Sequence, residues 1–120
     1  MTRAELLALA ERVERAEWAD LDLDRAVVEA IGWRFPNEGF ATTPDGRVVL
    51  RSHVPRYTSS LDAAASLVPD GWDWERYRSP TGMAMMVFRD GIGCHGHAAT
   101  PALALTAAAL RALAQEAGDE

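Results

Sequence analysis

The sequence predicts an α+β fold, in which helices cover a mainly antiparallel sheet of three to five strands. Apolar residues recur at helical spacing near both ends of the chain. Between them, three strand-like segments are separated only by short turn sequences, which join antiparallel neighbours. The length of 120 residues predicts a single domain over residues 1–120. Within it, we expect residues 1–18 to contain an added N-terminal helix that packs on the rest or mediates self-association.

Two helices and a hairpin are predicted before the core. Residues 2–16 carry leucine, alanine and valine at three- and four-residue spacing, and Thr2 followed by Glu5 has the spacing of a capping box. A second helix is predicted over residues 23–31 with Asp22 as its N-cap. Pro44-Asp45-Gly46 predicts a turn between two short strands.

The second half of the chain carries the predicted core, in the order helix, three strands, helix. Ser59 is the expected N-cap of the first of these helices. Asp90-Gly91 favours a type I′ hairpin turn, and Thr100-Pro101 is typical of a helix start. The predicted bounds are helix 61–68, strands 72–78, 83–89 and 92–99, and helix 101–116.

Composition and charge argue against several classes of function. The 18 acidic and 12 basic residues give a net charge of −6, which repels nucleic acid and anionic membranes. Cys94 is the only cysteine, so an internal disulfide and a thiolate zinc cluster are both excluded. The longest apolar run is too short to span a bilayer. We therefore expect a cytoplasmic protein with no cofactor and no membrane partner.

His95 and His97 are the first candidates for chemistry. Alternation along a strand places both imidazoles on one face, which is a workable start for a metal site. Such a site needs a third ligand, for which His53, Asp90 and Glu75 are the candidates. We favour the other interpretation, in which both histidines lie on the sheet face without a metal.

No catalytic residue is expected. Cys94 points to the opposite strand face from His95, so that imidazole cannot easily activate the thiol, and a small buried cysteine is the favoured interpretation. The sequence contains no Gly-x-Ser-x-Gly elbow and no phosphate-binding glycine loop. We predict that the protein is not an enzyme.

Trp72 and Trp74 share one face of the first core strand, and Arg76 and Arg78 lie on the same face if the strand is regular. Packing of the two indoles in the core is the favoured interpretation. The alternative is that all four residues form an exposed partner-binding face.

Several segments resemble the phage ABA-sandwich domain family of small phage and prophage proteins. These segments read VPRYTSSLDAA at 54–64, LVPDGW at 67–72, and ATPALAL with AAAL at 99–110, with a similar segment at 23–33. The resemblance covers roughly residues 20–115. It implies an α/β/α-type sandwich and a phage or prophage origin in a bacterial host, but no reaction and no catalytic residues.

The order of the core elements is also similar to that of double-stranded-RNA-binding domains. Those domains place lysines at the start of their last helix to meet phosphates. Here residues 97–102 read HAATPA, so the resemblance implies the fold and puts RNA binding in doubt.

We therefore expect a non-enzymatic phage or prophage accessory protein that binds an unidentified protein or a second copy of itself. A nucleic-acid-binding module is the alternative. A metal-dependent enzyme that uses His95 and His97 is the second alternative.

Overall fold

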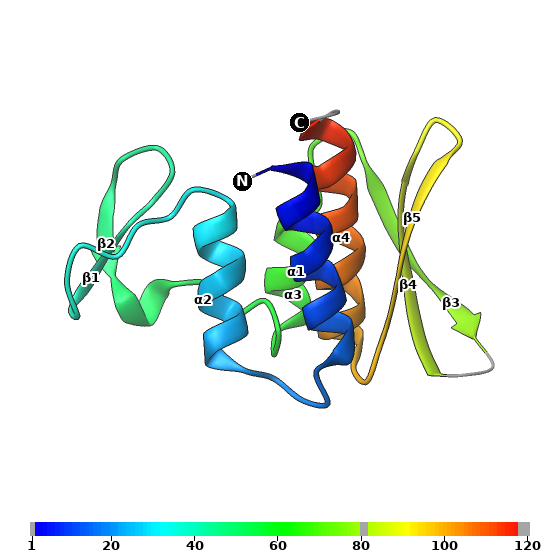
Figure 1. Ribbon diagram of the computed structural model, residues 1–120, viewed down its shortest axis with the longest axis horizontal. Coiled ribbons are helices and arrows are strands. Elements are labelled where there is room, and N and C mark those ends of the chain that lie inside the picture. The colour runs from blue at the N-terminus through cyan, green and yellow to red at the C-terminus, as the bar shows by residue number, and fades with distance from the viewer. Residues whose placement is uncertain (1, 80–81, 118–120) are drawn as a thin grey trace.

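The computed structural model describes residues 2–79 and 82–117. These residues form four α-helices and two antiparallel sheets, which confirms the predicted α+β class (Figure 1). The predicted order of helix, three strands and helix is also present. In chain order the elements are α1 (Arg3–Arg15), α2 (Leu21–Ala30), β1 (Phe40–Thr42), β2 (Val48–Leu50), the 3-10 helix η1 (Arg51–His53), α3 (Leu61–Ser66), β3 (Asp73–Ser79), β4 (Gly82–Arg89), β5 (Ile92–Ala98) and α4 (Pro101–Ala117).

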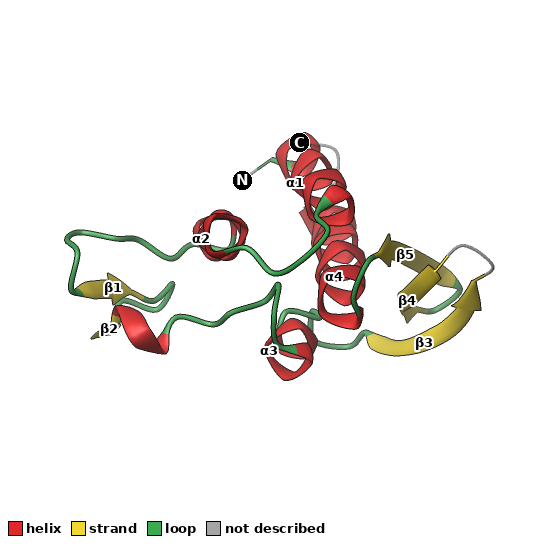
Figure 2. Ribbon diagram, turned by 90° about the horizontal axis from the view of Figure 1, so that it is seen from below, coloured by secondary structure: helices red, strands yellow, loops and turns green. Residues whose placement is uncertain are grey.

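Helix α4 lies at the centre of the fold. Figure 2 shows the three-stranded sheet on one side of it and helices α1 and α3 on the other. Its sequence explains this position, because a helix that is apolar all round must be covered on every side. Its buried residues are Ala102, Leu103, Ala104, Leu105, Thr106, Ala107, Ala108, Ala109, Leu110, Ala112 and Ala114.

The three-stranded sheet has the order β3-β4-β5, with both neighbouring pairs antiparallel. The turn between β4 and β5 has positive φ angles at Asp90 (47°) and Gly91 (83°), as the predicted type I′ turn requires. Val87 and Met85 of β4 face α4 and are almost fully buried. Opposite Met85, Gly96 of β5 lies so close to α4 that a Cβ atom there would be 2.0 Å from the carbonyl oxygen of Ala104.

Helix α1 packs along α4 through the apolar stripe that the sequence predicts. Thr2 and Glu5 form the predicted capping box, in which the Thr2 hydroxyl accepts from the Glu5 amide and the Glu5 carboxylate accepts from the Thr2 amide. The stripe of Leu6, Leu9, Ala10 and Val13 is buried. The N-terminal helix is therefore part of the core of this protein.

Two predicted N-caps are wrong by one or two residues. Asp20 rather than Asp22 caps α2, since its carboxylate accepts from the amides of Asp22 and Leu23. Ser60 rather than Ser59 caps α3. Both neighbourhoods contain more than one suitable capping side chain, and the entry direction of the chain decides which of them reaches the free amides.

The two-stranded sheet of β1 and β2 lies beyond α2, at the end of the molecule away from the three-stranded sheet (Figure 1). Ala41 is buried, whereas Phe40, Val48 and Leu50 leave about half or more of their surface exposed. None of the helices in the described part of the chain is long and apolar enough to cross a membrane.

Candidate functional site

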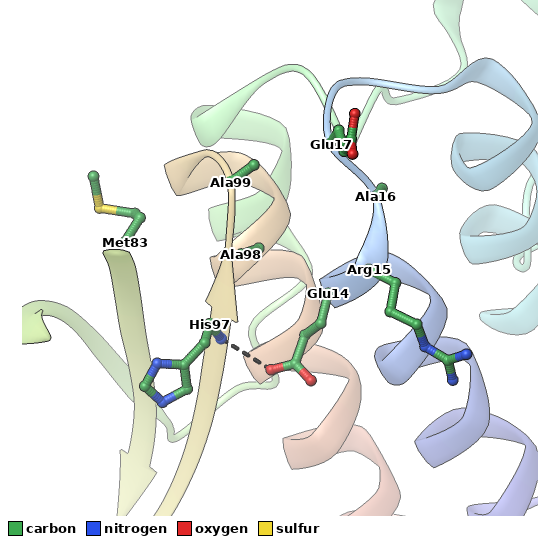
Figure 3. Close-up of a pocket in the computed structure, with 8 residues that line it drawn as sticks. All are labelled: Glu14, Arg15, Ala16, Glu17, Met83, His97, Ala98 and Ala99. Atoms are coloured by element: carbon green, nitrogen blue, oxygen red, sulfur yellow. Dashed lines mark hydrogen bonds between the residues drawn. The ribbon is translucent and has the colours of Figure 1, made fainter. Parts of the chain in front are cut away.

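The two outer edges of the three-stranded sheet differ, and this difference defines the candidate site. At the β5 edge, the Glu14 carboxylate of α1 accepts from the backbone amide of His97 over 2.9 Å (Figure 3). At the same edge, Arg111 of α4 donates to the backbone carbonyl of His95 over 2.7 Å. Side chains from two helices therefore occupy backbone groups that would otherwise be free at this edge.

Glu14 and Arg111 also bind each other through two hydrogen bonds. The Arg111 Nη1 and Nη2 atoms lie 2.7 and 2.6 Å from the two carboxylate oxygens of Glu14. Burial on its own would raise the pKa of Glu14, but the hydrogen bonds from Arg111 and the His97 amide outweigh it and lower that pKa. The hydrogen bond to Glu14 raises the pKa of Arg111. Both groups stay charged near neutral pH, and together they join α1, α4 and β5.

A hollow of about 390 Å³ opens beside this ion pair, between the end of α1 and the start of the loop after β5. Figure 3 shows the Glu14 carboxylate on one side of β5 and the imidazole of His97 on the other. The hydrogen bond from β5 to Glu14 is therefore made by the backbone amide of His97, and the imidazole points away from it.

The β3 edge is different, because no hydrogen bond joins its outer side to any other part of the described chain. Antiparallel strands bond through alternate residues, so the backbone groups of Trp74 and Arg76 point outward from the sheet. Trp74 leaves 38% of its surface exposed and Arg76 is exposed. This edge therefore offers free backbone donors and acceptors next to an indole and a guanidinium.

The four residues of the alternative partner-binding face do not all lie together in the structure. Trp72 is buried, and its indole Nε1 donates to Glu116 of α4 over 2.7 Å. Arg89 lies over the Trp72 ring, 5.0 Å from its centroid, and pairs with Glu116. Trp74 and Arg76 lie at the exposed edge as described, whereas the side chain of Arg78 lies outside the described part of the structure.

His95 and His97 lie on the exposed outer face of the sheet, and Cys94 is buried on the other face, as predicted. Burial raises the pKa of the Cys94 thiol, which disfavours a thiolate. Both imidazoles contact one phenol: the Tyr77 hydroxyl lies 3.0 Å from Nδ1 of His95 and 3.0 Å from Nε2 of His97.

Tyr77 did not emerge as a candidate from the sequence. It lies on β3, two strands away from the histidines, and the register places Ala84 of β4 between Tyr77 and His97. Ala84 is fully buried although it faces outward, because the larger side chains of Tyr77, His95 and His97 cover it. Tyr77, Ala84 and His97 form one row across the three strands. The cluster could therefore be predicted only if the pairing register of the strands were known, and the sequence alone does not give this register.

A second hollow, of about 410 Å³, lies between α2 and the segment after β2. The guanidinium groups of Arg25 and Arg51 stack over the ring of Phe35 there, at 4.6 and 4.8 Å from its centroid. Nε of Arg51 is buried and has no hydrogen-bond partner among the described residues. Asp22 and Asp24 line the same hollow, so its charge is mixed.

Comparison of the chain with known protein families, with curated proteins and with solved structures finds no match. The functional argument therefore rests on the geometry of the described residues.

Proposed function

We propose that this chain is a non-enzymatic accessory protein that acts by binding protein, and that the free edge of β3 is its binding surface. The observation that carries the proposal is the contrast between the two sheet edges. Glu14 and Arg111 occupy the backbone of β5, whereas no hydrogen bond from residues 2–79 or 82–117 reaches the outer side of the seven-residue strand β3. An open edge strand can pair with a further strand, which proteins use for recognition. The sequence resemblance leads us to include in this proposal a phage or prophage role and a location in the bacterial cytoplasm.

The partner that we propose is a second copy of the chain. If two β3 strands pair antiparallel about Glu75, Trp74 of each copy faces Arg76 of the other, on the same face of the joined sheet. Each cation–π pair of this kind contributes roughly 0.5–1 kcal/mol at an exposed site. The same register brings the two Glu75 side chains together, which opposes association by a few tenths of a kcal/mol up to about 1 kcal/mol. The two indole–guanidinium pairs and the new backbone hydrogen bonds together exceed this repulsion.

Sedimentation velocity over a wide range of protein concentration tests the proposal. Strand pairing buries little surface, so we expect a weak, concentration-dependent dimer. Arg76→Pro should abolish it, because proline removes an outward amide while leaving the bonds from β3 to β4 in place. Trp74→Ala should weaken it and Glu75→Gln should strengthen it.

Trp18→Ala is the matched control, since Trp18 is 70% exposed but lies outside the sheet. A chain that stays monomeric at every concentration overturns the proposal. So does a dimer that withstands Arg76→Pro, because that dimer would use another surface.

The nucleic-acid alternative shares the element order that the structure shows. It makes a different prediction: salt-sensitive binding of double-stranded RNA or DNA that weakens in Arg76→Ala without any change in oligomeric state. This result in a filter-binding titration would favour the alternative over protein binding.

A further inference from the structure

We propose that Tyr77, His95 and His97 form a binding site for a divalent transition-metal ion on the outer face of the sheet. The two imidazole nitrogens and the phenol oxygen are three donor atoms that already converge, since both nitrogens lie 3.0 Å from the oxygen. Among the described residues, no group of three histidine, cysteine or carboxylate side chains could hold a metal ion. In this proposal the Tyr77 phenol supplies the third ligand, because it already contacts both imidazoles.

The distances between the donor atoms suit a common metal ion. Bonds of about 2.0–2.2 Å from a central ion hold neighbouring nitrogen and oxygen donors about 2.9–3.4 Å apart. The observed separations of 3.0 Å fall in this range. The phenol has one hydrogen to donate, so it donates to one imidazole and accepts from the other. For an ion to bind all three atoms, the imidazole that donates takes its other tautomer, with its hydrogen on the other ring nitrogen, and the phenol loses its proton. That proton passes to water when the ion binds.

The packing around the cluster holds the three side chains in this arrangement. Tyr77 meets the two imidazoles edge-on, with ring centroids 5.4 Å from His95 and 5.9 Å from His97. The small side chain of Ala84 forms the floor beneath them and leaves room for the rings to lean together. Gly93 precedes His95 on the same face of β5, and a Cβ atom there would lie 3.7 Å from Nε2 of His95, so the lack of a side chain at Gly93 leaves room for this ring.

The donor set also indicates which ions fit. Imidazole suits zinc, copper and nickel, and a nitrogen and oxygen donor set with open positions suits Cu²⁺ and Ni²⁺ best. Both histidines are exposed, so water can enter and complete the coordination of the ion. Within the usual series of divalent ions, Cu²⁺ should bind most tightly.

Titration of the full chain with Cu²⁺ and, separately, with Zn²⁺ tests the site by calorimetry in a buffer that does not bind metals. We expect one ion per chain. Removal of a group that only orients a metal ligand weakens metal affinity by about tenfold or more. His95 and His97 are ligands themselves in this proposal, so His95→Ala and His97→Ala should each weaken metal affinity by at least about tenfold. His53→Ala is the matched control, because His53 is exposed on η1 and should leave the affinity unchanged.

Tyr77→Phe tests the phenol through a second readout. Coordination of the phenolate to Cu²⁺ should give a visible charge-transfer absorption band in the wild-type chain, and Tyr77→Phe should remove this band. Circular dichroism of each variant confirms that it is folded. Affinity that is unchanged in His95→Ala or His97→Ala, affinity that falls equally in His53→Ala, or an identical spectrum in Tyr77→Phe would each overturn the proposal.

Discussion

Replacement of Gly96 by alanine should be among the most destabilising single-methyl changes in this protein. The added Cβ would lie 2.0 Å from the carbonyl oxygen of Ala104 and 2.9 Å from the amide nitrogen of Ala108. Both atoms belong to the backbone of α4, so neither can rotate away. Relief of the contact requires β5 and α4 to separate by more than about 1 Å, which loosens the apolar layer between sheet and helix.

The expected loss of stability follows from two opposing effects. Overpacking in a core typically destabilises by about 1–3 kcal/mol, and a clash between two backbones belongs at or above the upper end of this range. Alanine restricts the unfolded chain more than glycine does, and this effect alone would raise the free energy of unfolding by about 0.4–1 kcal/mol. The free energy of unfolding should therefore fall by at least about 2 kcal/mol, and the melting temperature by roughly 8 °C or more.

Gly93→Ala on the same strand is the matched control. There the nearest atom to an added Cβ is the sulfur of Met86 at 3.3 Å, which is part of a flexible side chain that can move. Urea unfolding followed by tryptophan fluorescence measures both variants. A loss below about 1 kcal/mol for Gly96→Ala, or equal losses for the two variants, would show that the approach of β5 to α4 is not as close as the structure has it.

Two further substitutions and one reactivity measurement test other buried contacts. Glu14→Gln should lower the free energy of unfolding by about 1–2 kcal/mol at neutral pH. The pKa of Glu14 is lowered in the folded state, so the difference in stability between wild type and variant should shrink as the pH falls through that pKa. A difference in stability that stays constant down to strong acid would contradict this prediction. Asp24→Ala should cost about 1–3 kcal/mol in urea unfolding, since it leaves the buried amide of Thr58 without its acceptor, although the Thr58 hydroxyl keeps the carbonyl of Asp20 as an acceptor. Asp22→Ala should cost less than about 1 kcal/mol, because Asp22 is exposed. Cys94 should react with a thiol reagent much more slowly in the folded than in the urea-unfolded chain, and equal rates would refute its burial.

Local signals account for the parts of the fold that were correctly predicted. The capping box of Thr2 and Glu5, the turn at Asp90 and Gly91, and the helix start at Thr100 each involve residues that are close in sequence. Their preferred backbone angles and hydrogen bonds form with little help from the rest of the chain. The order of elements could therefore be predicted without any knowledge of packing.

The caps that were wrong show where local signals stop. Asp20, Asp22 and Asp24 all lie within one helical turn of the start of α2. The choice among them depends on Thr58, whose amide and hydroxyl donate to Asp24 and whose hydroxyl accepts from the amide of Asp20. That contact spans 34 or more residues of sequence, so a sequence pattern around α2 does not contain it.

The sequence by itself determined the order of the four α-helices and the five strands, the turn at Asp90 and Gly91, and the placement of His95 and His97 on one strand face. Only the tertiary structure decided that Tyr77 joins them, and that Glu14 and Arg111, which are 97 residues apart, close one edge of the sheet. The tertiary structure also decided that the other described residues leave the β3 edge without such a contact. The physical reason is that periodicity and capping act over a few residues of chain, whereas these contacts depend on strand register and on how α1 and α4 pack, which many weak contacts set together.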